Sequence, residues 1–193
     1  MSPSAGSASK LRGPQETALL LPVPGAERAV AEHRRRLDSA AADGIPAHLT
    51  VLHPFVPLDA LRAQDHDRLE ALFADEPPIS YAGRRTGWFG GQVLYLALDD
   101  ASPVRRLTEQ VVAAFPDHPP YGGAIPLEDV MPHLTIGHDR PLSELLAAEH
   151  AVAAHLPVED RLDHVELWSG PALAGRTSPK PWRHVRSYRL GTR

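Results

Sequence analysis

The sequence contains no cysteine among its 193 residues. This absence excludes disulfide bonds, zinc sites built from thiolates, and catalysis by a cysteine nucleophile. It is typical of proteins that work in a reducing compartment, and we expect the chain to be cytoplasmic.

Long apolar runs are also missing, so no segment is expected to span a membrane. Residues 1–14 are rich in Ser, Ala, Gly and Pro and lack the apolar core of a signal peptide. We expect this stretch to be a disordered N-terminal tail. Residues 15–193 are long enough to bury a sizeable core, and we expect them to form a single domain with two lobes.

An excess of positive charge is lacking as well. Lys and Arg together number 20, Asp and Glu number 24, and the formal net charge is −4. We therefore expect no extensive nucleic-acid surface, because non-specific binding to long nucleic acids needs many cationic contacts with phosphates. A small phosphorylated ligand or an RNA end is compatible with this charge, and we expect a monomer. The basic clusters at 34–36, 84–85 and 105–106 are expected to be solvated surface.

Local patterns predict an alternation of strands and helices. The expected strands are 17–23, 48–56, 79–89, 92–98, 133–137, 162–168 and 182–190. The expected helices are 25–42, 58–74, 102–115, with Ser102 as N-cap, and 142–156. Gly90 and Gly91 predict a hairpin turn, and the Pro- and Gly-rich loop 116–132 is long enough to shape a site.

A short segment occurs twice. His48-Leu-Thr-Val-Leu-His53 returns as His133-Leu-Thr-Ile-Gly-His138, at an offset of 85 positions (133 minus 48). Each copy is followed by an expected helix and two strands, which indicates an internal duplication. We therefore predict an α+β fold with two lobes related by a pseudo-twofold axis. Antiparallel-rich sheets would face each other across a central groove, with helices outside.

The repeat carries a set of polar side chains suited to phosphodiester cleavage. Because side chains alternate along a strand, His48 and Thr50 share one face, and His133 and Thr135 share the equivalent face. Displacement at phosphorus needs a base on the attacking oxygen and an acid on the leaving oxygen, and histidine suits both roles. The threonine hydroxyls can donate hydrogen bonds to the phosphate oxygens. We predict His48 and His133 as the catalytic pair and Thr50 and Thr135 as phosphate-binding residues.

Two further histidines, His53 and His138, raise the alternative of a catalytic metal. Each follows its motif histidine by five residues, and an odd spacing on a strand sends the two side chains to opposite faces. Neither segment contains an Asp or Glu that could serve as ligand or base. We expect no metal and no cofactor, and interpret both histidines as strand-end or packing residues.

The two motifs resemble those of the two-histidine phosphoesterase superfamily, which includes the 2′-5′ RNA ligase-like and cyclic phosphodiesterase proteins. The similarity extends over Pro46-Ala-His-Leu-Thr-Val-Leu-His-Pro-Phe55 and Pro132-His-Leu-Thr-Ile-Gly137. It implies a bilobal α+β fold with both motifs in a central groove. It also implies metal-independent hydrolysis of cyclic or 2′-linked phosphodiesters and, in some members, reversible ligation of RNA.

Five residues outside the motifs are further candidates for substrate binding. Tyr121 could reach the phosphate, stack on a base or simply anchor a turn. Trp88, next to Phe89, could form a stacking platform or pack in the core. Arg84 and Arg140 could hold a phosphate, as could Arg85 beside Arg84, since guanidinium groups bind phosphate in a bidentate manner.

The function expected from this sequence is hydrolysis of 2′,3′-cyclic or 2′-5′ phosphodiesters of nucleotides or RNA ends. One alternative is a 2′-5′ ligase that acts on tRNA-like ends. Another is a non-catalytic module that binds nucleotides or RNA. The paired histidines argue against this last alternative, because binding alone does not need two titratable groups that face each other.

Overall fold

The computed structural model of the chain describes residues 15–172 and 181–192. The expected N-terminal tail, 1–14, lies outside the described residues. The strands are β1 (Gln15–Pro22), β2 (His48–Leu52), β3 (Ile79–Gly83), β4 (Arg85–Phe89), β5 (Val93–Ala97), β6 (His133–His138), β7 (Val158–Leu162), β8 (His164–Pro171) and β9 (Arg183–Arg189). The α-helices are α1 (Glu27–Leu37), α2 (Ser39–Ala42), α3 (Ala63–Ala74), α4 (Ser102–Ala114) and α5 (Leu142–Ala153). Short 3-10 helices are η1 (Pro24–Ala26), η2 (Pro120–Gly123) and η3 (Leu127–Asp129).

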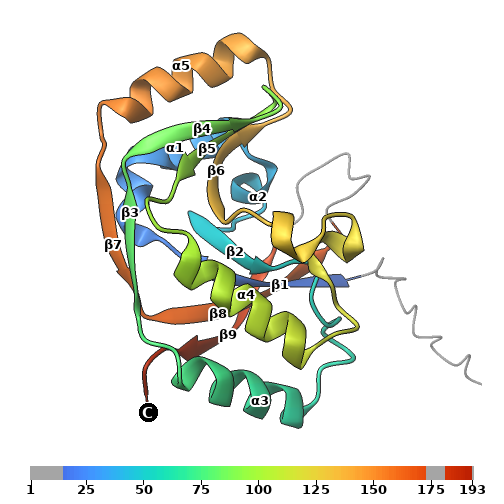
Figure 1. The fold of residues 1–193 in the computed structure, drawn as a ribbon. Helices are drawn as coiled ribbons and strands as arrows, with labels where there is room; N and C mark the ends of the chain where they lie inside the picture. Colours follow the sequence, from blue (N-terminus) through green and yellow to red (C-terminus); the bar gives the residue numbers. More distant parts are fainter. Residues whose placement is uncertain (1–14, 173–180, 193) are drawn as a thin grey trace, which may run out of the picture.

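The strands form three antiparallel sheets. One has the order β2-β1-β8-β9, a second has the order β4-β5-β6, and β3 pairs with β7. In Figure 1, β3 and β7 run along one side and join the part that contains β4–β6 to the part that contains β1, β8 and β9. The prediction of an α+β fold with antiparallel sheets is confirmed.

The two motif strands occupy matching places in their sheets. β2 lies at an edge beside β1, and β6 lies at an edge beside β5. His48 is opposite Pro22, the last residue of β1, and His133 is opposite Ala97, the last residue of β5. In both pairs the register also shifts at the equivalent point, next to Leu20 in β1 and next to Tyr95 in β5. The sequence repeat is therefore accompanied by a repeat of strand pairing.

The aliphatic face of each motif strand packs into the core. Leu49, Val51, Leu134 and Ile136 are all almost fully buried and belong to one large apolar cluster. Helix α4 covers β2, where the hydroxyl of Thr108 donates a hydrogen bond of 2.9 Å to a β2 carbonyl, and α1 packs on β6. Because the apolar side chains face the helices, the histidines and threonines of the motifs are left on the opposite face.

Several boundaries differ from the sequence-based expectation. The helix expected at 25–42 is broken at Asp38, which has extended backbone angles and whose carboxylate caps α2. Ser102 is not the N-cap of α4 but its first residue. The backbone N–H and the hydroxyl of Ser102 both donate hydrogen bonds to the carboxylate of Asp100. The strand expected at 162–168 is β8, and a separate strand that was not expected, β7, precedes it. The hairpin between β4 and β5 is confirmed, with Gly90 and Gly91 both at positive φ.

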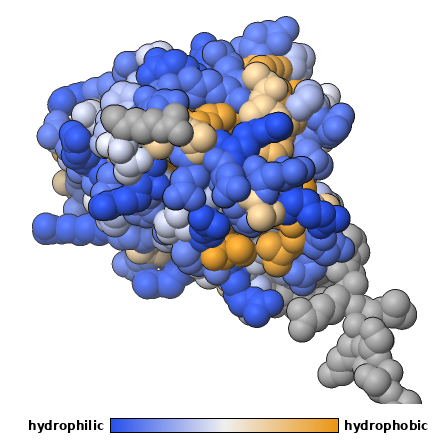
Figure 2. Space-filling model, turned by 90° about the horizontal axis from the view of Figure 1, so that it is seen from below, coloured by the Kyte–Doolittle hydropathy of each residue, from blue (hydrophilic) through white to orange (hydrophobic). Residues whose placement is uncertain are grey.

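The surface seen from below, on the side of α3 in Figure 1, is mainly hydrophilic, with hydrophobic residues in small groups (Figure 2). Within residues 15–172 and 181–192, every helix is too short or too polar to cross a bilayer.

Candidate active site on the two motif strands

The two motif histidines are held in the same way. The Nδ1 atom of His48 lies 2.7 Å from the carbonyl oxygen of Pro46, and Nδ1 of His133 lies 2.7 Å from the carbonyl oxygen of Met131. A carbonyl oxygen can only accept, so Nδ1 carries the proton in both rings. In the neutral form, each histidine therefore keeps the lone pair on Nε2 for proton transfer.

The two motif strands also approach each other. β2 and β6 are in contact although they belong to different sheets. His48 and His133 are both half-buried, as are Thr50 and Thr135 two residues further along each strand. The rings are close enough for a charge on His133 to lower the pKa of His48.

Both histidines favour the neutral state. Burial lowers the pKa of His48 to about 4, and the positive charges of Arg34 and His133 act in the same direction. Burial also lowers the pKa of His133 below its ordinary value of 6.5. A nearby negative charge would favour a second proton on either ring.

A buried arginine links the surroundings of the two motifs. Arg34 on α1 is only 2% exposed, and its guanidinium lies 2.8 Å from the carboxylate of Asp38. It also donates to the carbonyl oxygens of Thr135, at 3.1 Å, and of Ile45, at 3.4 Å. Burial alone would raise the pKa of Asp38, but the contact with His138 and the charge of Arg34 outweigh it and lower the pKa.

The histidines that end the two repeated segments have acidic partners. His53 lies 3.1 Å from the carboxylate of Glu16, and burial lowers the pKa of His53. His138 lies 3.6 Å from the carboxylate of Asp38 and 3.0 Å from that of Asp139, and these two partners raise its pKa to about 9. Within the residues described, no group of three or more His, Cys, Asp or Glu side chains is arranged to hold a metal ion.

Aromatic rings surround His133. Phe89 meets its imidazole edge-on, with ring centroids 4.8 Å apart, and Tyr95 lies at 5.4 Å. Phe89 and Tyr95 stack on each other at 4.3 Å. Tyr95 lies directly over Gly87, where a Cβ atom would come within 2.5 Å of the tyrosine ring, so only glycine leaves room for this arrangement.

A cavity of about 460 Å³ opens beside these rings. Its walls come from β4, β5, β6 and the loop 116–132. They are formed by Phe89, Val93, Tyr121, Ile125, Asp129, Val130, Met131 and His133. Tyr121, a candidate from the sequence, is thus brought to the same place as His133.

The other candidates from the sequence do not line this cavity. Trp88 points to α5, where its indole nitrogen donates to Glu149 at 2.9 Å, so Phe89 and not Trp88 faces the motif. Arg84 forms ion pairs with Asp99 and Glu159 at the junction of β3 and β4. Arg140 is exposed at the opposite end of β6 from His133. Arg85 faces the same side as His133, because both residues are opposite Ala97 in neighbouring strand pairs.

The sequence did not reveal the roles of Arg34, Asp38 and Tyr95. Arg34 belongs to a basic cluster that we expected to be solvated, and for this residue the expectation is wrong. The spacing of four residues between Arg34 and Asp38 on a helix was the available signal. Nothing in the local sequence separates Tyr95 from an ordinary strand residue.

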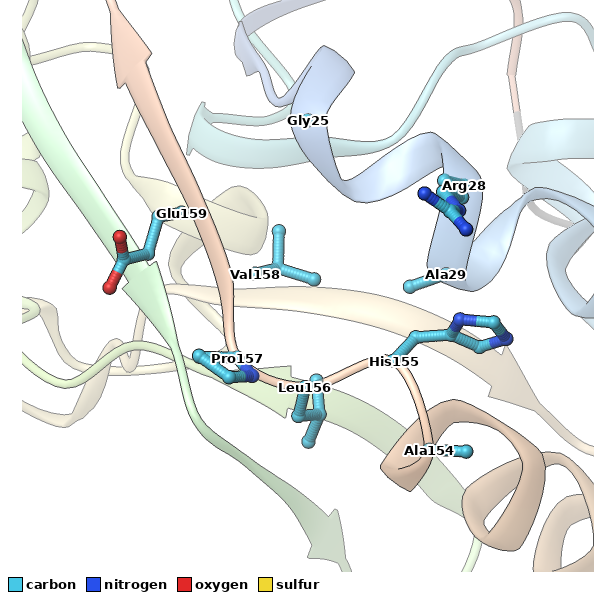
Figure 3. Close-up of a pocket in the computed structure, with 9 residues that line it drawn as sticks. All are labelled: Gly25, Arg28, Ala29, Ala154, His155, Leu156, Pro157, Val158 and Glu159. Atoms are coloured by element: carbon cyan, nitrogen blue, oxygen red, sulfur yellow. The ribbon is translucent and has the colours of Figure 1, made fainter.

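A second cavity, of about 420 Å³, lies between α1 and the turn from α5 to β7. Figure 3 shows Arg28 and His155 on one side of it and the Glu159 carboxylate pointing away. Its lining contains neither motif histidine, so it does not add to the site on β2 and β6.

Comparisons with known proteins show which fold and family this chain shares. A protein of Geobacillus thermodenitrificans named "Putative phosphoesterase" is 27% identical over 139 residues, which cover 70% of this chain and 76% of that protein. Crystal structures of E. coli LigT with 3′-AMP and with NADP+ each superpose with a TM-score of 0.54 at 17% identity. They cover 92% and 93% of this chain and 98% and 99% of the LigT chain.

The structure of TT0787 of Thermus thermophilus has the same fold, with a TM-score of 0.53 at 16% identity. The match covers 91% of this chain and 98% of that one. At this level of identity, these solved structures show a shared LigT-like fold. Residues 21–171, most of the described chain, match the family named 2′-5′ RNA ligase superfamily. The chain therefore belongs to the 2′-5′ RNA ligase superfamily, that is, to the two-histidine phosphoesterases.

Proposed function

We propose that this protein is a metal-independent phosphodiesterase that hydrolyses 2′,3′-cyclic or 2′-5′ phosphodiesters of nucleotides or RNA ends. The observation that carries the proposal is the matched clamping of the two imidazoles. Each Nδ1 is fixed by the carbonyl oxygen two residues earlier, which leaves two Nε2 atoms from adjacent strands for one substrate. We further propose that the halves bearing β2 and β6 are related by a pseudo-twofold axis and that the phosphate binds in a groove between them.

In this mechanism a water molecule attacks phosphorus while one imidazole takes its proton through Nε2. The other imidazole gives a proton to the ribose oxygen that leaves, so the pair exchanges protonation states during the reaction. The hydroxyls of Thr50 and Thr135 donate to the non-bridging oxygens as charge accumulates on them. The two proton transfers need no metal ion.

We assign the base to His48 and the acid to His133. His48 is the ring whose proton is harder to keep, because burial, Arg34 and His133 all lower its pKa. These three causes outweigh the Pro46 carbonyl and Asp38, which favour the charged form of His48. For His133, burial opposes the charged form and the carbonyl of Met131 favours it. A bound phosphate would therefore protonate His133 more readily than His48.

A nucleotide is the substrate class that relatives favour. E. coli LigT has been crystallised with 3′-AMP, ATP and NADP+, and its fold is shared by this chain. The family name also supports a second candidate function, 2′-5′ ligation of RNA ends. Ligation would use the same two proton transfers on a 2′,3′-cyclic phosphate, with the 5′-hydroxyl of a second RNA end in place of water as the nucleophile.

The test is turnover of the four nucleoside 2′,3′-cyclic phosphates by the purified protein in the presence of EDTA. We expect opening to a monophosphate at an undiminished rate in EDTA, and loss of that activity in His48→Ala. Absence of turnover on cyclic and 2′-5′-linked substrates by a folded protein would refute the hydrolase. Activity that EDTA abolishes and one divalent ion restores would refute the metal-independent mechanism.

A further inference from the structure

Three of the large apolar side chains exposed on the described surface gather at the cavity beside His133. Tyr121 is 39% exposed, Ile125 37% and Met131 44%, and all three line its walls. Exposed apolar side chains that converge on one concavity are typical of a ligand site. The volume of about 460 Å³ lies within the range of small-molecule sites.

The cavity is continuous with the proposed catalytic face. His133 itself forms part of its wall, and Phe89, whose ring meets the imidazole edge-on, lines the same cavity. Phe89 is held in place by stacking on Tyr95. A flat aromatic group in the cavity can stack on Phe89 or Tyr121 while a phosphate attached through a ribose lies at His133.

The far wall is tied to the motifs, so the cavity exists before a ligand binds. The backbone nitrogen of Tyr121 donates a hydrogen bond of 2.8 Å to the carbonyl oxygen of His53, at the end of the first motif. Tyr121 has a φ of 53°, a left-handed conformation that this contact helps to hold. Met131 lines the cavity and also fixes Nδ1 of His133 through its carbonyl oxygen.

Among the described residues that line the cavity, Asp129 is the acidic one, and it is exposed at the rim. A carboxylate only accepts hydrogen bonds, and its two oxygens suit a pair of adjacent donors. Guanine presents such a pair, the N1–H and the exocyclic amino group, on one edge. Adenine and cytosine offer an amino group beside an acceptor nitrogen, and uracil offers one N–H between two carbonyl oxygens.

We propose that this cavity is a nucleobase subsite that prefers guanine, with Asp129 as the specificity-determining residue and Phe89 and Tyr121 as stacking surfaces. The proposal rests on the proposed function, since the reaction at His133 defines where the phosphate of the occupant lies. It predicts that guanosine 2′,3′-cyclic phosphate is the best of the four cyclic nucleotides.

The test separates binding from turnover. Dissociation constants of guanosine, adenosine, cytidine and uridine 2′- and 3′-monophosphates are measured by calorimetry on the full chain, because monophosphates bind without being hydrolysed. The same set is measured for Asp129→Asn and for Glu128→Gln, a matched control whose carboxylate is exposed next to Asp129 but outside the lining. Ile125→Ala tests the apolar wall, with Leu146→Ala on α5, which is 48% exposed, as its control.

We expect the guanosine monophosphates to bind the parent most tightly. Asp129→Asn should weaken their binding by about tenfold or more, the usual effect of losing hydrogen bonds to a charged group, and change uridine binding by less than about twofold. Ile125→Ala should weaken all four nucleotides, and the two control variants should match the parent. Equal binding of all bases, or equal losses for Asp129→Asn and Glu128→Gln, would overturn the proposal even if cyclic nucleotides are hydrolysed. Selective binding without any turnover would instead refute the proposed function and leave the subsite standing.

Discussion

The guanidinium of Arg34 donates a hydrogen bond of 3.1 Å from Nε to the carbonyl oxygen of Thr135, in the middle of the second motif strand. The same side chain reaches the carbonyl oxygen of Ile45, three residues before the first motif histidine. One buried cation on α1 therefore touches the backbone of both motif regions. It also lies close enough to His48 to lower the pKa of that ring.

Replacing Arg34 should have two effects: it should destabilise the protein and shift the pH profile of kcat/KM. Arg34→Met leaves the buried Asp38 carboxylate without its main cation, and breaking a buried ion pair costs about 3 kcal/mol or more. Loss of the positive charge near His48 should also raise the pKa of that histidine, so the acidic limb of kcat/KM should move to higher pH. Denaturant unfolding and a pH–rate series measure the two effects.

Arg35→Met is the matched control, because Arg35 follows Arg34 on the same helix and is exposed. Its unfolding free energy should change by less than about 0.5 kcal/mol. If Arg34→Met were as stable as Arg35→Met and kept the parent pH profile, the linking role of Arg34 would be wrong.

Sequence reasoning predicted the motif strands well because their period-two pattern is local. His48, Thr50, His133 and Thr135 are set by strand alternation, and no distant contact is needed to find their faces. Trp88 and Phe89 show the limit of this reasoning. They are neighbours on β4, and only the packing of α5 against Trp88 decides that Phe89 faces His133.

The charge pattern failed to predict the burial of Arg34 for a related reason. The run Arg34–Arg36 looks like one basic cluster, but a helix turns each side chain in a different direction. Arg34 points into the interface with β6, whereas Arg35 and Arg36 are exposed. Burial of one member depends on where α1 docks, which is a tertiary contact that no window of sequence contains.

His138 should make the stability of the protein fall as pH rises above neutrality. Its contacts with Asp38 and Asp139 raise the folded-state pKa to about 9, whereas the ordinary value is 6.5. The stabilisation is fully present below pH 6.5 and is lost as pH rises from 6.5 through 9. The free energy of unfolding, measured by denaturant titration across this window, should decline with pH.

His138→Gln should flatten that decline, because the variant has no group that titrates at this position. His150→Gln, at an exposed position on α5, should keep the slope of the parent. A parent protein whose unfolding free energy is constant between pH 6.5 and 9, or equal slopes in both variants, would contradict the assigned pairing of His138.

The pH dependence of kcat/KM should show a maximum on the acidic side of neutrality. His48 must be neutral as the base, so the rate should rise as pH passes about 4. His133 must be protonated as the acid, so the rate should fall as pH passes its pKa, which lies below 6.5. The two limbs belong to the interacting pair. A single plateau that extends unchanged through about pH 8 would be incompatible with this assignment.

The assignment of His48 as base and His133 as acid can be tested with substrates that have two different leaving groups. On a 2′,3′-cyclic nucleotide, His48→Ala and His133→Ala should each lower kcat by roughly 10²–10⁴-fold, the usual contribution of one positioned proton-transfer group. On a nucleoside 2′-(p-nitrophenyl phosphate), the nitrophenolate leaves without a proton. His133→Ala should then cost less than about tenfold, because the acid is no longer needed, whereas His48→Ala should stay as impaired as before.

The double variant and the threonines complete this comparison. His48→Ala/His133→Ala should be much less impaired than the product of the single effects, because the two groups act as a unit. On the cyclic nucleotide, Thr50→Ala and Thr135→Ala should cost less than either histidine variant, since other donors still hold the phosphate. Each variant is first checked for native unfolding behaviour, so that a loss of rate reports chemistry.

If His48→Ala and not His133→Ala were rescued by the nitrophenyl substrate, the roles of the two histidines would be exchanged. If folded His48→Ala or His133→Ala turned over the cyclic nucleotide at nearly the parent rate, the repeated motif would have a structural role only, and other residues would carry out the chemistry.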